Sequence, residues 1–221
     1  MPHITQAQWK EAVAVLKQGG VILCPTETAY GLVADATNKK ATKRVRNLKE
    51  RPEEKSFPLI VASLAMAKRY ALFSPQLLIL AKRYWPGPLT MVVPARSRLE
   101  LSPDVISHGT IAIRVSSNPI ARSLSRRLNA PVVGTSANHS GDPNSYTVEE
   151  ALASLGKNVD DCLDGGRLRP RKPSTMIKEE QTGVTILRQG DLKIPKTYVA
   201  KSEKKFQSKL SQRQACSCQD Y

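Results

Sequence analysis

The sequence lacks long apolar runs and is poor in cysteine and aromatic residues. No stretch approaches the roughly 20 apolar residues that a membrane-spanning helix needs, so we expect a protein that does not cross a membrane. The N-terminal segment carries Glu11 where a signal peptide has an unbroken apolar stretch. Four cysteines are too few for a disulfide framework, and Cys24 and Cys162 lie in apolar runs typical of buried thiols. These absences predict a cytoplasmic protein in a reducing compartment.

The familiar signatures of phosphate and metal sites are missing as well. Neither G-x-x-x-x-G-K-S/T nor G-x-G-x-x-G occurs, which argues against a P-loop or a Rossmann nucleotide site. There is no H-E-x-x-H motif, and the three histidines, His3, His108 and His139, lie far apart in the sequence. We therefore expect no metal ion held by protein side chains alone.

The charge of the chain is strongly one-sided. Lys and Arg number 34 against 19 Asp and Glu, which gives a formal net charge of +15 at pH 7. Such an imbalance produces a positive field at the surface, and it favours anionic partners such as nucleotides, RNA or acidic membrane surfaces. Charge alone does not choose among them.

Helical and strand patterns alternate along the chain. Thr5 and Gln8 form a capping box before an amphipathic helix that ends at Gly19 and Gly20. Further helices are expected at 41–50, 74–84, 119–128 and 147–156, and strands at 21–24, 57–62, 89–93, 110–115, 132–133, 159–163, 174–177 and 184–187. This order predicts one α/β domain over residues 1–195, followed by a basic and disordered tail, residues 196–221.

Small polar and cationic residues gather at the ends of the apolar runs, where α/β domains place ligand sites. Four segments stand out, namely 25–32, 49–55, 134–141, and the set formed by 111–115, 173–176 and 186–190. Arg114 and Arg188 both follow apolar strand residues, so each needs a paired anion. That anion could be a ligand carboxylate or phosphate, or an Asp or Glu of the chain itself.

Taken together and in this order, these segments resemble the YrdC family of threonylcarbamoyl-AMP synthases, in its short, TsaC-like form. The matching stretches are PTETAYGL, the K-x-R of Lys49 and Arg51, WPGPLT, IAIRV, the S-x-N within GTSANHSG, PST and ILRQG. The resemblance covers residues 10–190. It implies a single YrdC-like domain in which a twisted mixed β-sheet with flanking helices surrounds a large, positively charged cavity.

The resemblance also implies a nucleotidyltransferase that acts in tRNA modification. In that family L-threonine and bicarbonate form a carbamate, which attacks the α-phosphorus of ATP, releases pyrophosphate and leaves threonylcarbamoyl-AMP. Separate transferase proteins then pass the threonylcarbamoyl group to an adenosine of tRNA. Attack at phosphorus mainly needs positioning and neutralisation of negative charge, so the lack of a Ser-His-Asp or Cys-His arrangement fits this chemistry.

The family's site residues carry over to named positions of this chain. The resemblance assigns Thr28, Arg114 and Ser174 to L-threonine, and Lys49, Arg51, Ser136 and Asn138 to catalysis. The positions assigned to ATP are Lys49, Arg51, Thr110, Ser136, Asn138 and Arg188, with Lys55 and Asn144 as possible additions. Mg²⁺ is expected with ATP, held by phosphate oxygens rather than by a protein-only site.

The chain departs from the longer family members in two respects. Some of these have a histidine at the end of the strand that follows K-x-R, where this chain has Ala62, so its threonine contacts could differ. The additional C-terminal domain of the long form is not expected, because only the basic tail follows residue 195.

Two other hypotheses for the function of the chain remain open. The first is a non-catalytic protein of the same fold that binds tRNA or double-stranded RNA, for which the net charge is the main argument. Aromatic stacking platforms are scarce, however, with only three Phe, six Tyr and two Trp. The second is a carbamoyl-transferring relative, which would need further catalytic domains that 221 residues do not encode.

Overall fold

The computed structural model describes residues 4–97, 100–156 and 158–200. Six α-helices, one short 3-10 helix and ten strands make up this part of the chain. The helices are α1 (Gln6–Lys17), α2 (Lys39–Lys49), α3 (Leu64–Tyr70), α4 (Pro75–Tyr84), α5 (Pro119–Leu128) and α6 (Val148–Leu155), with the 3-10 helix at Pro103–Val105. Among the residues described, no helix has both the length and the apolar character needed to cross a membrane.

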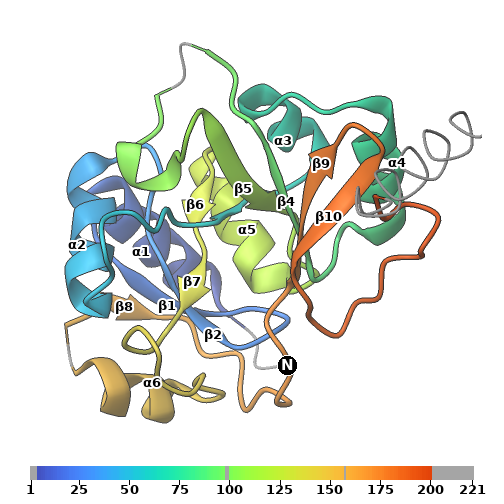
Figure 1. The fold of residues 1–221 in the computed structure, drawn as a ribbon. Coiled ribbons are helices and arrows are strands. Elements are labelled where there is room, and N and C mark those ends of the chain that lie inside the picture. Colours follow the sequence, from blue (N-terminus) through green and yellow to red (C-terminus); the bar gives the residue numbers. More distant parts are fainter. Residues whose placement is uncertain (1–3, 98–99, 157, 201–221) are drawn as a thin grey trace, which may run out of the picture.

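The strands divide between two mixed sheets (Figure 1). The four-stranded sheet has the order β7-β2-β1-β8, with β7 (Thr135–Ser136), β2 (Tyr30–Val33), β1 (Ile22–Pro25) and β8 (Asp161–Cys162). The six-stranded sheet has the order β10-β9-β4-β5-β3-β6, with β10 (Gly183–Arg188), β9 (Thr175–Glu180), β4 (Leu89–Pro94), β5 (Thr110–Arg114), β3 (Leu59–Ile60) and β6 (Val132–Val133). Parallel and antiparallel pairs occur in both sheets, which confirms the mixed α/β class that the sequence predicted.

The chain crosses from one sheet to the other at Gly134, between β6 and β7. A Cβ atom at this position would lie 2.5 Å from the Cδ1 and Cγ1 atoms of Ile60, so no side chain fits here. Gly31 has a similar role in β2, where a Cβ atom would lie 2.8 Å from the carbonyl oxygen of Thr135 in the neighbouring β7. Gly134 thus lets the crossing segment pass close to β3, and Gly31 lets β2 and β7 pair closely within the four-stranded sheet.

Helices α1 and α5 pack together against strands of both sheets. Their apolar faces meet Ile22 of β1 and Ile60 of β3 in one buried cluster. A larger core, which includes Tyr30, Phe57 and Leu89, lies between the sheets and the remaining helices. Burial on this scale supplies most of the free energy that favours folding, and it fixes the relative position of the two sheets.

The helix ends agree closely with the sequence, whereas several strands differ. Thr5 caps α1 in the expected capping box, Ser74 caps α4, and Asn129 ends α5 in the left-handed conformation with φ 56°. The expected strand at 57–62 is paired only over Leu59–Ile60. Helix α3 and the strands β2 and β7 were not expected, and each contributes to the two-sheet arrangement.

Pairing at the C-terminal end continues beyond residue 195. Val199 forms a parallel bridge with Val184 of β10, and the Ala200 amide donates to the Val184 carbonyl over 3.0 Å. Of the tail expected from the sequence, residues 198–200 thus pair with the edge of the six-stranded sheet. Residues 201–221 of that expected tail lie outside the described residues.

Candidate active site

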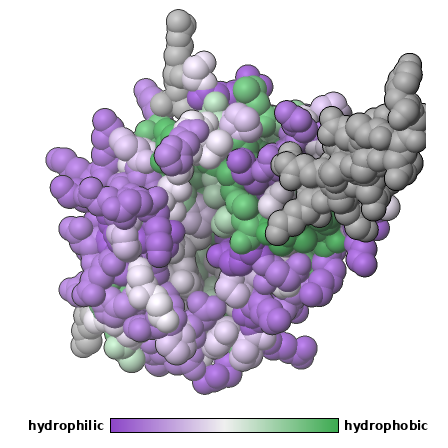
Figure 2. Space-filling view, viewed as in Figure 1, coloured by the Kyte–Doolittle hydropathy of each residue, from purple (hydrophilic) through white to green (hydrophobic). Residues whose placement is uncertain are grey.

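A cavity of about 420 Å³ lies between the two sheets. Its walls come from the loop after β1, the loop after α2, strands β4, β5 and β9, the β6–β7 crossing, and the end of β10. Figure 2 shows a face that is largely hydrophilic and recessed near its centre, with apolar groups gathered toward β9 and β10. A volume of this size is typical of sites for small molecules and cofactors.

The cationic side chains of the lining outnumber the acidic ones. Arg51, Lys55, Arg114 and Arg188 line the cavity, and Glu54 is the one acidic residue among the described residues of its wall. Because like charges that converge in a partly enclosed space repel one another, an anion in the cavity would relieve this repulsion. The lining therefore favours anionic ligands.

Arg114, at the end of β5, is paired with an acidic residue of the chain itself. Its Nε lies 3.1 Å from Oε1 of Glu27, and the two side chains are 6% and 5% exposed. The two atoms approach without the alignment of a hydrogen bond, so charge attraction carries the contact. The Ser116 hydroxyl donates to the other oxygen of Glu27. This acid fixes Arg114 at the cavity wall and answers the question of its partner that the sequence left open.

Ser174 and Arg188 form a second fixed group beside Arg114. Arg188 donates through Nε to the Ser174 carbonyl and through an Nη atom to the Ser174 hydroxyl, both over 3.0 Å. That hydroxyl also lies 2.8 Å from the Thr90 hydroxyl. Partial burial and the nearby charge of Arg114 lower the pKa of Arg188. Both guanidinium groups line the cavity, where their like charges interact.

The loop after β1 presents Thr28 to the cavity. The Thr26 hydroxyl donates to the Ala29 carbonyl over 2.7 Å, and it lies 3.1 Å from the Thr28 hydroxyl. Below this turn, the Tyr30 hydroxyl donates to Asp164 and to the Gly166 carbonyl, each over 2.9 Å. The Tyr30 bonds join the start of β2 to the chain after β8. The turn that carries Thr28 is thus supported by the Thr26 bonds within it and by the anchored strand that follows it.

Arg51 lies in the loop that follows α2 and reaches the cavity from there. It donates to the carbonyl oxygens of Lys55 and Ser56 over 3.0 and 2.9 Å, and its guanidinium lies 5.1 Å from the centre of the Phe57 ring. Partial burial, with the charges of Arg46 and Arg188, lowers the pKa of Arg51. Arg51 holds its loop in place while adding charge to the cavity.

Thr110, Ser136 and Asn144 complete the set of lining residues that the sequence predicted. The Thr110 hydroxyl donates to the Ser107 carbonyl over 2.7 Å. The Ser136 hydroxyl donates to Oδ1 of Asn138 over 2.6 Å, which leaves the Ser136 oxygen as an acceptor for a donor group of a ligand.

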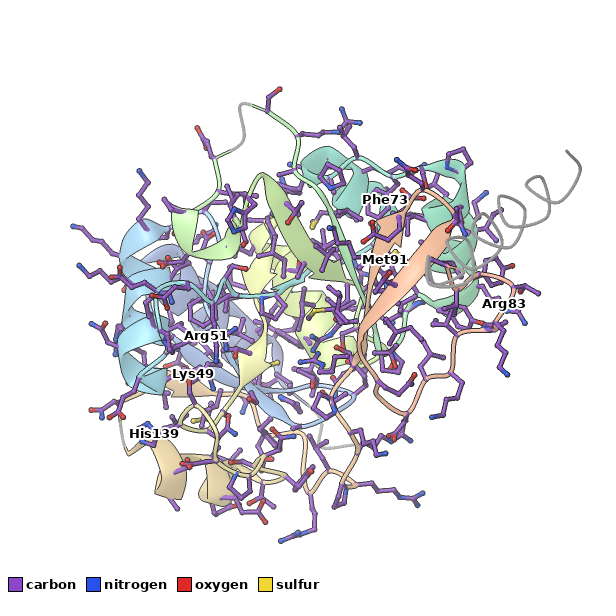
Figure 3. All side chains as sticks on the ribbon, in the orientation of Figure 1. Lys49, Arg51, Phe73, Arg83, Met91 and His139 are labelled. Atoms are coloured by element: carbon purple, nitrogen blue, oxygen red, sulfur yellow. The ribbon has the colours of Figure 1, made fainter. Side chains whose placement is uncertain are left out.

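Two predicted site residues, Lys49 and Asn138, are placed differently from the others. Neither lines the cavity, and they are 2% and 4% exposed. Figure 3 shows Lys49 beside Arg51, between α2 and β7. Lys49 Nζ donates to the carbonyl oxygens of Ser136 and Asn138. The structure thus brings nine of the predicted residues to one cavity and puts these two behind its wall.

Glu27, which pairs with Arg114, and Tyr30, which lines the cavity, were not among the site residues that the sequence predicted. The signal for Glu27 was available, because Arg114 needed an acid and Glu27 stands between two threonines at a strand end. Ala62, the position where some family members have a histidine, is buried in the main core and does not line the cavity.

The lining residues offer little to a metal ion. Over residues 4–97, 100–156 and 158–200, no three His, Cys, Asp or Glu side chains come together as a metal site would require. Glu54 is the sole carboxylate among the described lining residues.

Comparison with known proteins assigns the chain to a protein family. The model of the Sua5/YciO/YrdC family, described as telomere recombination, matches residues 14–190. A protein of Coxiella burnetii named threonylcarbamoyl-AMP synthase is 35% identical over 176 residues, which are 78% of this chain and 92% of that protein. The protein of the same name from Pyrococcus abyssi is 34% identical over 190 residues, 84% of this chain and 55% of its own length.

Solved structures agree with these sequence matches. The structure of Pyrococcus abyssi Sua5 complexed with L-threonine superposes with a TM-score of 0.79 at 31% identity, over 86% of this chain and 56% of that one. Escherichia coli YciO superposes with a TM-score of 0.79 at 28% identity, over 89% of this chain and 95% of that one. The chain thus spans little more than half of the Pyrococcus protein but nearly all of the Escherichia coli protein.

Proposed function

The chain belongs to the Sua5/YciO/YrdC family, and from that premise we propose that it makes threonylcarbamoyl-AMP from L-threonine, bicarbonate and ATP. The observation that carries the proposal is the cavity, where four cationic side chains and several hydroxyl groups meet with one carboxylate in the described lining. Such a lining suits a substrate set in which every member carries negative charge. The relatives named threonylcarbamoyl-AMP synthase support the same activity.

The reaction needs no nucleophile from the protein. The amine of threonine attacks bicarbonate, and loss of water leaves a carbamate. A carbamate oxygen then attacks the α-phosphorus of ATP, the bond to the bridging oxygen breaks, and pyrophosphate leaves with its electron pair. Fixed cations stabilise the negative charge that spreads over the phosphoryl oxygens in such a displacement.

The two ends of the cavity suit the two parts of the product. Thr28, Arg114 and Ser174 form the amino-acid end, where a guanidinium can take both oxygens of the threonine carboxylate. Arg51, Lys55, Thr110, Ser136, Asn144 and Arg188 are the residues proposed to contact ATP as its Mg²⁺ complex. The bound L-threonine of the similar Pyrococcus abyssi structure supports an amino-acid end in this fold.

Pyrophosphate release tests the proposal. The parent chain is incubated with ATP and Mg²⁺, and L-threonine or bicarbonate is left out in turn, with glycine as a control amino acid. Release that requires threonine and bicarbonate together is the expected result. Equal release without threonine, or with glycine, would show that the cavity serves another reaction. The unstable product also implies partner proteins that transfer its threonylcarbamoyl group to tRNA.

A second candidate function, the binding of tRNA or double-stranded RNA, is favoured by one segment of the surface. Arg167, Arg169, Arg171 and Lys172 are exposed in the loop that leads to Ser174 at the cavity. Cations in such a row suit a phosphate backbone, and their contribution falls as salt rises. If RNA is a partner, reversal of these four charges should weaken tRNA binding at low salt and leave threonine-dependent pyrophosphate release intact.

A further inference from the structure

The lysine of the K-x-R motif makes an unusual number of contacts with a single segment. Lys49 Nζ donates to the Ser136 carbonyl over 2.6 Å, to the Asn138 carbonyl over 2.6 Å and to Asn138 Oδ1 over 3.0 Å. An ammonium group has three protons, so these three acceptors use its whole donor capacity. The main-chain carbonyl of Lys49 also accepts from the amide and hydroxyl of Ser140, over 3.1 and 3.0 Å.

Asn138 ties the same segment together from within. Its Nδ2 donates to the carbonyl oxygens of Asp142 and Pro143, over 2.6 and 3.1 Å. These two acceptors fix the orientation of the amide, so that Oδ1 must point to Lys49 and to the Ser136 hydroxyl. One buried amide therefore joins both ends of the loop to the lysine behind it.

The backbone between Lys49 and Arg51 explains why two neighbouring cations face different ways. Glu50 ends α2 in the left-handed conformation, with φ 49° and ψ 42°. This turn leaves Lys49 buried against β7, while Arg51 emerges into the cavity. The S-x-N motif likewise has one residue at the cavity and one behind it, because Ser136 lines the cavity and Asn138 is buried.

We propose that Lys49 and Asn138 are positioning residues, a buried clamp that holds the cavity-wall segment (residues 134–145) so that Gly134, Thr135, Ser136 and Asn144 face the nucleotide. Lys49 does not contact phosphate in this arrangement. A direct contact would require Lys49 to break these bonds and leave their acceptors without a donor, which is unfavourable for buried groups. The clamp itself stands on the contacts, and its catalytic consequence rests on the function proposed above.

Amide hydrogen exchange of the ligand-free protein tests the clamp without any substrate. Lys49→Met keeps an unbranched side chain that is one heavy atom shorter and removes its donors, and Asn138→Ala removes the amide. Lys43→Met is the matched control, because Lys43 is an exposed lysine of the same helix. We expect exchange in 134–145 to rise by about tenfold or more in the first two variants, to stay within about twofold in the control, and to remain unchanged in α1. Unchanged protection of 134–145 in Asn138→Ala and in a folded Lys49→Met would overturn the clamp.

Kinetics then separate positioning from direct contact. A clamp predicts that Lys49→Met and Asn138→Ala each raise KM for ATP about tenfold, that the double variant costs little more than either single one, and that KM for threonine stays within about twofold. A large effect of Lys49→Met alone, with Asn138→Ala near the parent, would mean that Lys49 touches the nucleotide. If Lys49→Met does not fold, Asn138→Ala decides the exchange result. A parent chain that releases no pyrophosphate would refute the proposed function and leave the exchange experiment valid.

Discussion

The cations of the cavity fall into two groups that the chain holds in different ways. Arg114 and Arg188 end strands of the six-stranded sheet, and each is fixed by groups of the protein, namely Glu27 and Ser174. Arg51 and Lys55 belong to the loop after α2, where Arg51 is held by carbonyl oxygens and Lys55 is exposed. The strand group is preset by side chains of other elements, with Arg114 proposed for the threonine carboxylate and Arg188 for ATP. In the loop group, Arg51 is preset by local carbonyl oxygens, and the exposed Lys55 can adjust to a longer, more variable polyphosphate.

The largest effect is expected in the strand group, from Arg114→Ala. This change removes the residue proposed to bind the threonine carboxylate and leaves the buried carboxylate of Glu27 without its cation. We expect threonine affinity to fall by about 10³ or more, and the free energy of unfolding to fall by about 3 kcal/mol. Calorimetry with threonine and chemical denaturation measure the two losses.

A double variant, Glu27→Gln with Arg114→Met, separates the loss of threonine affinity from the loss of stability. Removal of both charges should restore most of the stability but none of the threonine binding. Normal threonine binding by Arg114→Ala would show that the strand group is purely structural.

The loop group should respond differently to the same kind of truncation. Arg51→Ala should lower turnover by about 10² to 10³, because a preorganised cation near the reacting phosphate is lost. Threonine affinity should stay near that of the parent, and stability should change by less than about 1 kcal/mol, because no buried acid loses its partner. A loss of threonine affinity equal to that of Arg114→Ala would remove the distinction between the two groups.

The pH dependence of ATP binding tests the clamp formed by Lys49 and Asn138. Burial and the charge of Arg51 lower the pKa of Lys49 to about 8, and Asp142 opposes this shift. Above this pH the neutral amine has one proton fewer for its three acceptors. We expect ATP affinity to fall about fivefold to tenfold between pH 7 and pH 9 in the parent and to stay level in Lys49→Met. A parent that binds ATP equally well across this range would contradict the prediction.

Whereas ATP affinity should fall as the pH rises, the contribution of Lys49 to the stability of the domain should increase. The folded-state pKa of Lys49, about 8, lies below the ordinary value of 10.5. Between these values the unfolded chain binds the additional proton, so the contribution of Lys49 makes the free energy of unfolding rise with pH. Lys49→Met should lack this part of the slope, and denaturation at a series of pH values measures it.

The smallest effect is expected from Lys55→Ala. Lys55 is exposed, so its charge acts through water and salt screens it. KM for ATP should rise about threefold at low salt, and the difference from the parent should largely vanish at about 1 M salt. An effect as large as that of Arg51→Ala would show that Lys55 is also preset.

Local signals in the sequence predicted the helix ends well and the strand pairing less well. Thr5, Ser74 and Asn129 act on groups a few residues away, so their caps depend little on the rest of the chain. Strand β7 was missed because it forms only where Ser136 meets Gly31 of β2, a partner more than a hundred residues distant. Strand β2 was missed because its start lies within the polar segment 25–32, which looked like a loop. A two-residue strand such as β7 has no periodicity to detect, and the four residues of β2 are all buried and show no alternation.

The same limit applies to the site. The motifs identified the segments that meet at the cavity, yet Lys49 and Arg51 look equivalent as cations two positions apart. Only the left-handed turn at Glu50 separates the buried lysine from the cavity arginine. Whether a motif residue touches the ligand or supports its neighbour depends on backbone geometry that a sequence pattern does not encode.

The crossing at Gly134 has a consequence for how the site comes into being during folding. The cavity draws its wall from segments between Thr26 and Arg188 that meet only when both sheets are in register. Loop closure over such separations is slow, so we expect the complete site to form late in folding. A ligand of the cavity should therefore bind the folded domain and not the unfolded chain. Saturating ATP should then raise the melting temperature of the whole domain by mass action.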